Sequence, residues 1–275
     1  MGLMCQVFQV SKSGYYGWRR RPESKRLKRK VEIMGQIEQI HQNSKGRYGA
    51  PRVYHSLRNQ GVKITRSTVS RWMKESGLRA KTKRKFRVVT TDSNHKLPVA
   101  ENVLNRNFEP RAPGEVLASD ITYIPTTEGW LYLAVTIDLG TRKVAGWCMG
   151  EKMTEKLVSD ALTMAIGRVN LQPGAIHHSD RGSQYASNKF QELLANNQLN
   201  PSMSRKGNCW DNAPTESFFH SLKTELVYFE NYQTREDAKK SIFEYIEVFY
   251  NRLRLHSAIN YKTPVDYENN FDKCA

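Results

Sequence analysis

Residues 115–149, EVLASDITYIPTTEGWLYLAVTIDLGTRKVAGWCM, set the architecture of the chain. Three apolar, β-prone runs lie in this stretch, at residues 115–124, 130–138 and 143–149, and the connections between them are short and contain glycine. Consecutive strands joined in this way form a meander. The first strand carries Asp120 in the middle of its apolar run, where a carboxylate is costly unless a cation offsets its charge.

The region after residue 150 alternates helical and strand patterns. Apolar residues recur at helical spacing over residues 153–168 and 187–197. Short β-prone runs cover residues 175–178 and 201–204, and a helix begins near Pro214, a residue that suits a first helical turn. The resulting order, βββαβαβα, predicts an α/β fold with a mixed sheet flanked by helices on both faces.

Charge is distributed unevenly along the chain. Its 275 residues include 43 Lys and Arg against 27 Asp and Glu, a formal net charge of +16. Residues 1–96 hold 24 of the basic residues and 5 of the acidic ones, whereas residues 97–275 hold 19 and 22. The basic first third predicts a polyanionic partner, nucleic acid rather than a membrane surface.

Cysteine usage and hydropathy exclude several classes of protein. None of the four cysteines is spaced as C-x-x-C, so neither a disulfide framework nor a zinc site is indicated. No apolar run is long enough to span a bilayer, and no signal peptide is recognisable. We therefore expect a cytoplasmic protein.

Within this basic region, residues 23–87 are predicted to form a helical DNA-binding module. Its first helix carries Leu27, Val31, Met34, Ile37 and Ile40 at helical spacing. Two short helices follow, joined by a turn and ended by Gly61 and Gly77, and the second of them is polar and basic, which is typical of a helix-turn-helix. Residues 1–22 are either part of a further helix-turn-helix or a frayed basic terminus, and residues 88–110 are a linker.

Two groups of side chains in this module are candidates for DNA contact. The candidate groove contacts on the second helix, each with a solvated helix face as the alternative, are Arg66, Ser67, Ser70, Arg71 and Lys74. The candidate phosphate contacts, in the basic arm that follows, are Lys81, Lys83, Arg84, Lys85 and Arg87.

Three carboxylates at structurally special positions suggest a metal site. Asp120 lies inside the first strand, Asp180 ends the fourth, and Glu216 lies in the first turn of the helix that begins near Pro214. Oxygen-only ligands favour Mg²⁺ or Mn²⁺, and two such ions support in-line phosphoryl transfer. We expect the three carboxylates to lie within shared reach of a cation. Lys223 is seven residues after Glu216 and therefore faces the same way.

Several blocks of sequence make this chain similar to a known family. They are KGRYGAPRVYHSLRNQG at residues 45–61, the strand meander itself, HHSDRGSQYAS at 177–187, SMSRKGNCWDNAPTESFFHSLKTEL at 202–226 and YNRLRLHSAINYKTP at 250–264. In this order they resemble the catalytic part, OrfB, of insertion-sequence transposases of the IS-three family. These are DDE transposases with a ribonuclease H-like, integrase-type catalytic core. The resemblance covers nearly the whole chain.

The resemblance implies an activity and a role for each matched residue. Asp120, Asp180 and Glu216 match the metal-binding catalytic carboxylates, with 35 residues between the last two, and Lys223 matches the residue that contacts the DNA end. The implied activity is Mg²⁺-dependent DNA cleavage and strand transfer at the ends of an element, by a polynucleotidyl transferase acting on the bacterial nucleoid. The implied partners are element and target DNA, other copies of the chain as a homo-oligomer, and the upstream OrfA product through a frameshift fusion.

Two other functions remain open at this point. One is a ribonuclease H-like nuclease that cleaves without joining strands, and the other is a catalytically silent DNA-binding regulator. On the transposase reading, residues 111–230 are the catalytic core and residues 231–275 are a helix and tail packed on it, with a capping box at Thr234 and Asp237. Four polar residues of this tail either contact DNA or tie it to the core by hydrogen bonds, and we favour the second role: Asn251, Arg252, Arg254 and His256.

Other polar residues near the carboxylates have two interpretations. Asp138 supports the metal site or, as we prefer, caps the turn after its strand, and Asp211 has a role in its turn rather than as a fourth ligand. His177 and His178 lie on opposite faces of their strand and are packed residues more readily than proton carriers. His220 departs from the family pattern, in which a small residue is usual at this position.

Overall fold

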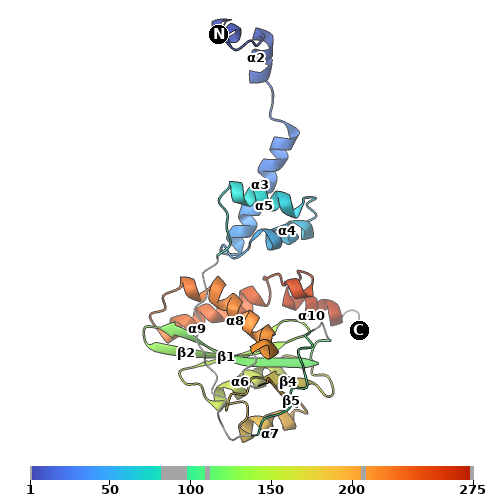
Figure 1. Cartoon of the computed structure of the whole chain (residues 1–275), viewed down its shortest axis with the longest axis vertical. Coiled ribbons are helices and arrows are strands. Elements are labelled where there is room, and N and C mark those ends of the chain that lie inside the picture. The colour runs from blue at the N-terminus through green and yellow to red at the C-terminus, as the bar shows by residue number, and fades with distance from the viewer. Residues whose placement is uncertain (1, 82–97, 109–111, 206–208, 273–275) are drawn as a thin grey trace. The chain divides into compact units, whose positions relative to one another are not determined.

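The computed structural model describes residues 2–81, 98–108, 112–205 and 209–272, and it divides into two compact units, Met1–Ala80 and Lys81–Ala275. Figure 1 shows a helical first unit and a second unit built on a sheet. No helix in the described ranges is both long enough and apolar enough to cross a membrane.

The first unit consists of helices only. They are α1 (Gly2–Val7), α2 (Lys12–Arg19), α3 (Lys25–Asn43), α4 (Ala50–Asn59) and α5 (Arg66–Glu75). The predicted pair of short helices corresponds to α4 and α5. Gly61 and Gly77 follow these helices with φ of +81° and +69°, a left-handed conformation that glycine adopts without steric cost and that ends a helix.

The buried residues of α3 match the predicted apolar line only in part. Ile33 and Ile37 are its buried residues, whereas Leu27 and Val31 are 45% and 63% exposed. Ile33 and Ile37 are four residues apart, so they lie one above the other on a single face. Ile37 belongs to the predicted line and Ile33 does not, because the helix is long enough to offer more than one apolar line.

The second unit contains one five-stranded mixed sheet. Its strands are β1 (Val116–Thr126), β2 (Gly129–Asp138), β3 (Val144–Gly150), β4 (Ile176–Ser179) and β5 (Asn200–Met203). Their order is β3-β2-β1-β4-β5, in which β1, β2 and β3 form the antiparallel meander and β4 and β5 are added in parallel. The predicted α/β fold is confirmed, with β1 in the centre.

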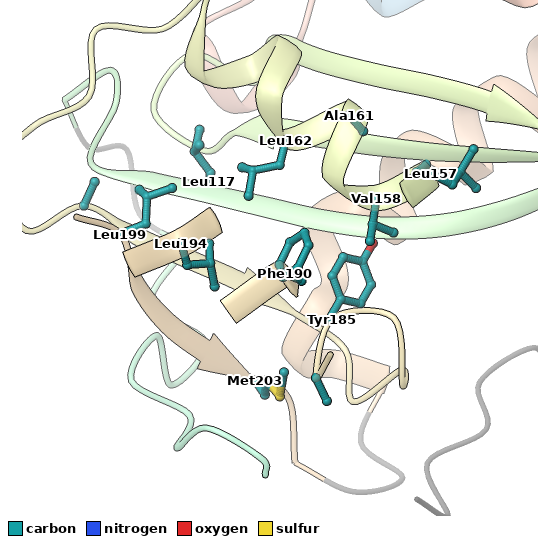
Figure 2. Close-up of a cluster of buried hydrophobic side chains, with 13 residues drawn as sticks. Leu117, Leu157, Val158, Ala161, Leu162, Tyr185, Phe190, Leu194, Leu199 and Met203 are labelled. Carbon is teal, nitrogen blue, oxygen red and sulfur yellow. The ribbon is translucent and has the colours of Figure 1, made fainter. Parts of the chain in front are cut away.

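Helices cover both faces of this sheet. Helices α6 (Glu155–Ile166) and α7 (Asn188–Asn196) pack on one face, and α8 (Ala213–Glu225) and α9 (Arg235–Phe243) lie on the other (Figure 1). Figure 2 shows the core between the sheet and the first pair, where Leu117 of β1 meets Leu162 of α6 and Phe190 of α7. This apolar layer packs against one face of the central strand.

The C-terminal tail is tied to the core. Thr234 and Asp237 form the predicted capping box of α9, which continues as a π-helical segment, η3 (Glu244–Tyr250). The Asn251 side chain bonds both the N–H and the C=O of Val144, and Arg254 is buried, so the structural role is confirmed for these two residues. Arg252, in contrast, is exposed. A 3₁₀ turn, η4 (Ser257–Ile259), and α10 (Pro264–Asp272) complete the unit.

Candidate active site

The central strand β1 presents Asp120 where one of its edges opens. It pairs with β2 along its length, but it pairs with β4 only over Val116–Ala118. Beyond Ala118 no strand in the described part of the chain pairs with that edge, and the Ile121 N–H donates to Asp120 Oδ1 at 2.8 Å. The aspartate is therefore partly buried, within the sheet but at an accessible edge.

Asp180 lies directly after β4, the strand next to β1. The Gly182 N–H donates to Asp180 Oδ1 at 2.9 Å and closes a tight turn around the carboxylate. A Cβ on Gly182 would lie 3.0 Å from that oxygen, so glycine allows this close approach. The neighbouring Arg181 donates through Nε to the carbonyl oxygen of Ser204 at 2.7 Å, which joins the turn to the chain after β5.

Glu216 and Lys223 come from α8. Pro214 lies in the first turn of this helix, as predicted, and Glu216 is exposed there. Lys223, two turns later, is partly buried, with its ammonium 4.7 Å from the centroid of the Tyr123 ring on β1. Both side chains are thus brought to the open edge of the central strand.

The three carboxylates influence one another electrostatically. Burial raises the pKa of the Asp120 carboxyl well above its usual range, and the negative charges of Asp180 and Glu216 raise it further. The Ile121 hydrogen bond and the Lys223 ammonium act in the opposite direction. A carboxylate in such surroundings is stabilised by added positive charge, and an oxygen-only donor set suits a hard divalent cation.

The three carboxylates are not gathered into one ready-made cation site in this structure, so their shared binding of a metal ion stays a prediction. In the part of the chain that the structure describes, no group of three or more His, Cys, Asp or Glu side chains is placed to hold a metal ion. Glu216 is exposed on its helix, Asp120 and Asp180 are partly buried at the sheet, and the charges of Asp180 and Glu216 both act on the Asp120 carboxyl.

The two histidines before Asp180 are buried hydrogen-bonding residues. His177 Nε2 lies 2.8 Å from Ser119 Oγ, and His178 Nδ1 lies 2.9 Å from Ser202 Oγ. Burial lowers the pKa of His177 to about 3 and that of His178 to about 4, so both rings are neutral near pH 7. The preferred interpretation as packed residues agrees with these contacts.

Asp138 and Asp211 both act as buried hydrogen-bond acceptors. Asp138 accepts from the N–H groups of Gly114 and Gly140 and from the Thr141 hydroxyl, so it caps the turn as preferred. Asp211, in the short helix η1 (Cys209–Asn212), is fully buried, and its role is larger than the one expected within its turn.

Asp211 fixes the segment that leads into α8. It accepts hydrogen bonds from the backbone and side chain of Arg205 at 2.9 Å, from Arg106 Nε at 2.7 Å and from Asn102 Nδ2 at 2.9 Å. The next residue, Asn212, donates through Nδ2 to the Ser119 carbonyl oxygen at 3.3 Å, directly beside Asp120. Sequence reasoning missed both anchors, because Arg106 and Ser119 are remote in the chain and no spacing rule connects them.

The candidate groove contacts of the first unit all face solvent. The inward residues of α5 are Val69 and Met73. The exposed ones are Arg66, Ser67, Ser70, Arg71 and Lys74. Among the basic-arm candidates, Lys81 is exposed, whereas Lys83, Arg84, Lys85 and Arg87 lie outside the described residues.

Comparisons with known proteins identify related sequences over the whole chain. Residues 110–209 and 216–271 match two family models described as an integrase core domain, and residues 28–86 match an HTH-like domain. The 31 kDa protein of insertion element IS600 from Shigella sonnei is 44% identical over 99% of this chain and 100% of its own length. Transposase InsF for insertion sequence IS3A from Escherichia coli K12 is 45% identical over 97% of this chain and 93% of its own.

Among solved structures, the intasome of simian T-cell lymphotropic virus in complex with a PP2A regulatory subunit aligns with a TM-score of 0.49. Its sequence is 15% identical to this one, and the alignment covers 84% of this chain and 74% of the other.

Proposed function

This chain belongs to the family of insertion-sequence transposases with an integrase core, and from that premise we propose that it cleaves DNA at the ends of a mobile element and joins them to target DNA. Such an enzyme is a polynucleotidyl transferase of the DDE type. The family assignment rests on identity along nearly the full length of two relatives.

The electrostatic coupling of three carboxylates at the open edge of β1 is the observation that supports this function best. Asp120, Asp180 and Glu216 come from three separate segments, and burial together with the charges of Asp180 and Glu216 disfavours the charged form of the Asp120 carboxyl. A packed protein has no structural need for such a group of like charges. We assign all three as catalytic residues.

These same residues would hold a divalent metal ion, Mg²⁺ or Mn²⁺, and we propose two ions per site. When bound, such ions supply the positive charge that activates the attacking oxygen and stabilises the leaving oxygen. The chain's own contribution is to place carboxylate oxygens on β1, on the turn after β4 and on α8, with Lys223 beside them.

DNA binding divides among several parts of the chain in this proposal. Lys223 binds the phosphate of the DNA end, while the exposed face of α5 enters a groove and the basic residues after it contact the backbone. We propose that residues 23–87 recognise DNA, that 111–230 carry out the chemistry and that 231–275 support the core. The chain acts on the nucleoid as a homo-oligomer, with the OrfA product as fusion or partner.

Strand-transfer assays on oligonucleotides that bear the element's ends test this function. The wild-type chain is expected to join ends only when Mg²⁺ or Mn²⁺ is present. Joining is expected to disappear in Asp120→Asn, Asp180→Asn and Glu216→Gln, because each change removes a ligand charge with little change in shape. Glu192→Gln, at an exposed carboxylate on α7, is the matched control and keeps full activity.

The same assay separates the other functions. Cleavage without joining identifies a nuclease, and binding without cleavage identifies a regulator. Joining that persists in all three carboxylate variants contradicts the assignment of the site.

A further inference from the structure

An exposed tryptophan stands at the end of an aromatic row beside the candidate active site. The rings of Tyr123 and Trp130 meet edge to face with centroids 4.7 Å apart, and the Lys223 ammonium lies 4.7 Å from the centroid of the Tyr123 ring. Lys223 in turn lies within electrostatic reach of Asp120. Asp120, Lys223 and the two aromatic rings thus follow one another, with Trp130 at the far end.

Trp130 remains 50% exposed although the hairpin that carries it is firmly held. Arg235 donates through Nε to the Trp130 carbonyl oxygen at 3.2 Å and through its backbone N–H to Glu128 at 2.8 Å. The Thr127 N–H donates to the carbonyl oxygen of Tyr232 at 3.0 Å. Because these bonds fix both sides of the turn, the ring is presented to solvent by a rigid element.

The row lies along β1 in the direction that leads away from Asp120. Trp130 pairs across the sheet with Pro125, five residues after Asp120. At roughly 3.3 Å per residue, this pairing lies about 16 Å along the strand from the carboxylate. If the DNA end reacts at Asp120, as the proposed function has it, this distance is within the reach of its next few nucleotides.

We propose that Trp130, supported by Tyr123, is a stacking platform for unpaired bases next to the reacting DNA end, while Lys223 binds the adjoining phosphate. The inference rests on the proposed function, since it takes the DNA end to lie at the carboxylates. A cation beside an exposed aromatic ring matches the alternation of phosphate and base along a single strand. Stacking on such a ring accepts every base, so the platform acts on strand separation without reading sequence.

Photo-crosslinking locates the bases directly. The full chain is mixed with a short single-stranded oligomer of thymidine and 5-iodouridine, irradiated, and digested for peptide mapping. An adduct is expected on the peptide that contains Trp130, and it is expected to disappear in Trp130→Ala. Phe243→Ala is the matched control, because Phe243 is 49% exposed and meets Trp147 edge to face at 5.8 Å in the same unit.

A comparison of two DNA ends measures the consequence. Duplexes with mismatched terminal base pairs are expected to bind and react better than fully paired duplexes with the wild-type chain. Trp130→Ala is expected to lose between about 5-fold and about 150-fold in affinity for the mismatched ends, the range for one base–aromatic contact. Trp130→Phe retains a ring and is expected to retain most of the preference, and melting temperatures confirm that each variant is folded.

The outcomes distinguish the platform from the function on which it rests. An adduct at Trp130 without any strand joining supports the platform and contradicts the transposase activity. Strand joining without an adduct, and with the same preference for mismatched ends in Trp130→Ala, overturns the platform alone. A third outcome also overturns the platform. The wild type gives no adduct, and sedimentation without DNA shows that Trp130→Ala has lost self-association. The ring then binds a second copy of the chain.

Discussion

The strand-borne and the helix-borne halves of the site are held in different ways. Asp120 lies on β1 and Asp180 directly after the adjacent strand β4, and an apolar core packs against this sheet (Figure 2). Glu216 is carried by α8, and a buried carboxylate takes part in ion pairs at each end of that helix. These carboxylates are Asp211, just before α8, and Glu225, its last residue.

This difference indicates which half of the site is displaced first when the pH or a side chain is changed. Apolar packing in the sheet depends weakly on pH, whereas an ion pair is lost when either partner is neutralised or removed. Buried charges also make a fold less tolerant, because removing one partner leaves the other uncompensated. We therefore expect α8 to be displaced under conditions that leave β1 and β4 intact.

The largest effect is expected from Arg254→Ala at the end of α8. Arg254 donates to both oxygens of Glu225 at 2.8–3.1 Å, and both side chains are buried. The variant leaves the Glu225 charge buried without a cation, with the Tyr245 hydroxyl still donating to it, so the free energy of unfolding is expected to fall by about 3–5 kcal/mol. Denaturant titration measures this loss. Arg252→Ala, at an exposed neighbour, is expected to change it by less than about 0.5 kcal/mol, and an equal loss in both variants would contradict the role of the pair.

A smaller loss, about 2–3 kcal/mol, is expected from Asp211→Asn at the other end of α8. The side chains of Arg106 and Arg205 are 43% and 48% exposed, so they turn to water when the carboxylate is removed. Hydrogen exchange is expected to rise around residues 209–216 and to stay unchanged in β1. Asp160→Asn, at an exposed pair with Lys156, is the control and is expected to alter stability by no more than about 0.5 kcal/mol.

The pH dependence of Asp211 gives a second measurement of the same anchor. The hydrogen bond from the Arg205 side chain holds the pKa of the Asp211 carboxyl well below its usual range. The folded protein therefore keeps this group ionised at pH values where the unfolded chain protonates it. The stabilisation is complete above the ordinary pKa of about 4 and declines as the pH falls below it. A difference between wild type and Asp211→Asn that stays constant down to low pH would contradict this account.

The order and type of elements in the second unit could be predicted because their signals are local. The apolar runs of β1, β2 and β3 and the helical spacing of α6 lie within short windows, and the observed ends of the elements differ from the predicted ones by a few residues. The position of Asp120 at the middle of the central strand followed from the same pattern.

The contacts that complete the site could not be predicted in this way. Asp211 binds Arg106, and Asn212 binds the backbone of Ser119, across intervals of 105 and 93 residues. Tertiary packing alone brings such partners together, and no periodicity records it. The exposure of Glu216 was also unpredictable, because helical position gives the direction of a side chain but not its distance from a neighbouring element.

In the strand-borne half, the titration of His177 is expected to make the stability of the protein moderately dependent on pH. Burial lowers its pKa to about 3, with a further contribution from His178, so the folded protein resists protonation that the unfolded chain accepts below about pH 6.5. Stability is therefore present above the ordinary histidine pKa and falls as the pH decreases, by about 1–2 kcal/mol between pH 6.5 and pH 5 for one such group.

The variant His177→Gln keeps a hydrogen-bonding group beside Ser119 and removes the titration. Thermal melts across this pH range are expected to show about half the wild-type slope, because His178 still titrates with its pKa lowered to about 4. A wild-type slope that persists in His177→Gln would place the acid sensitivity in the helix-borne half instead.

The smallest change in stability is expected from Gly182→Ala, which tests whether the strand-borne half is as rigid as its packing indicates. The added methyl group would lie 2.9 Å from Gln184 Oε1 and 3.0 Å from Asp180 Oδ1, both at the ends of side chains. Alanine also lowers the entropy of the unfolded chain, which offsets part of that cost. The free energy of unfolding, followed through the melting temperature, is therefore expected to change by less than about 1 kcal/mol.

Strand transfer is nevertheless expected to fall in Gly182→Ala, because the Asp180 carboxylate must move to accept the methyl group. Gly167→Ala, where the nearest atoms are 3.7 Å away, is the matched control for both measurements. Full activity in Gly182→Ala would mean that Asp180 tolerates displacement, and the two halves of the site would then differ in how they are anchored but not in how precisely they must be placed.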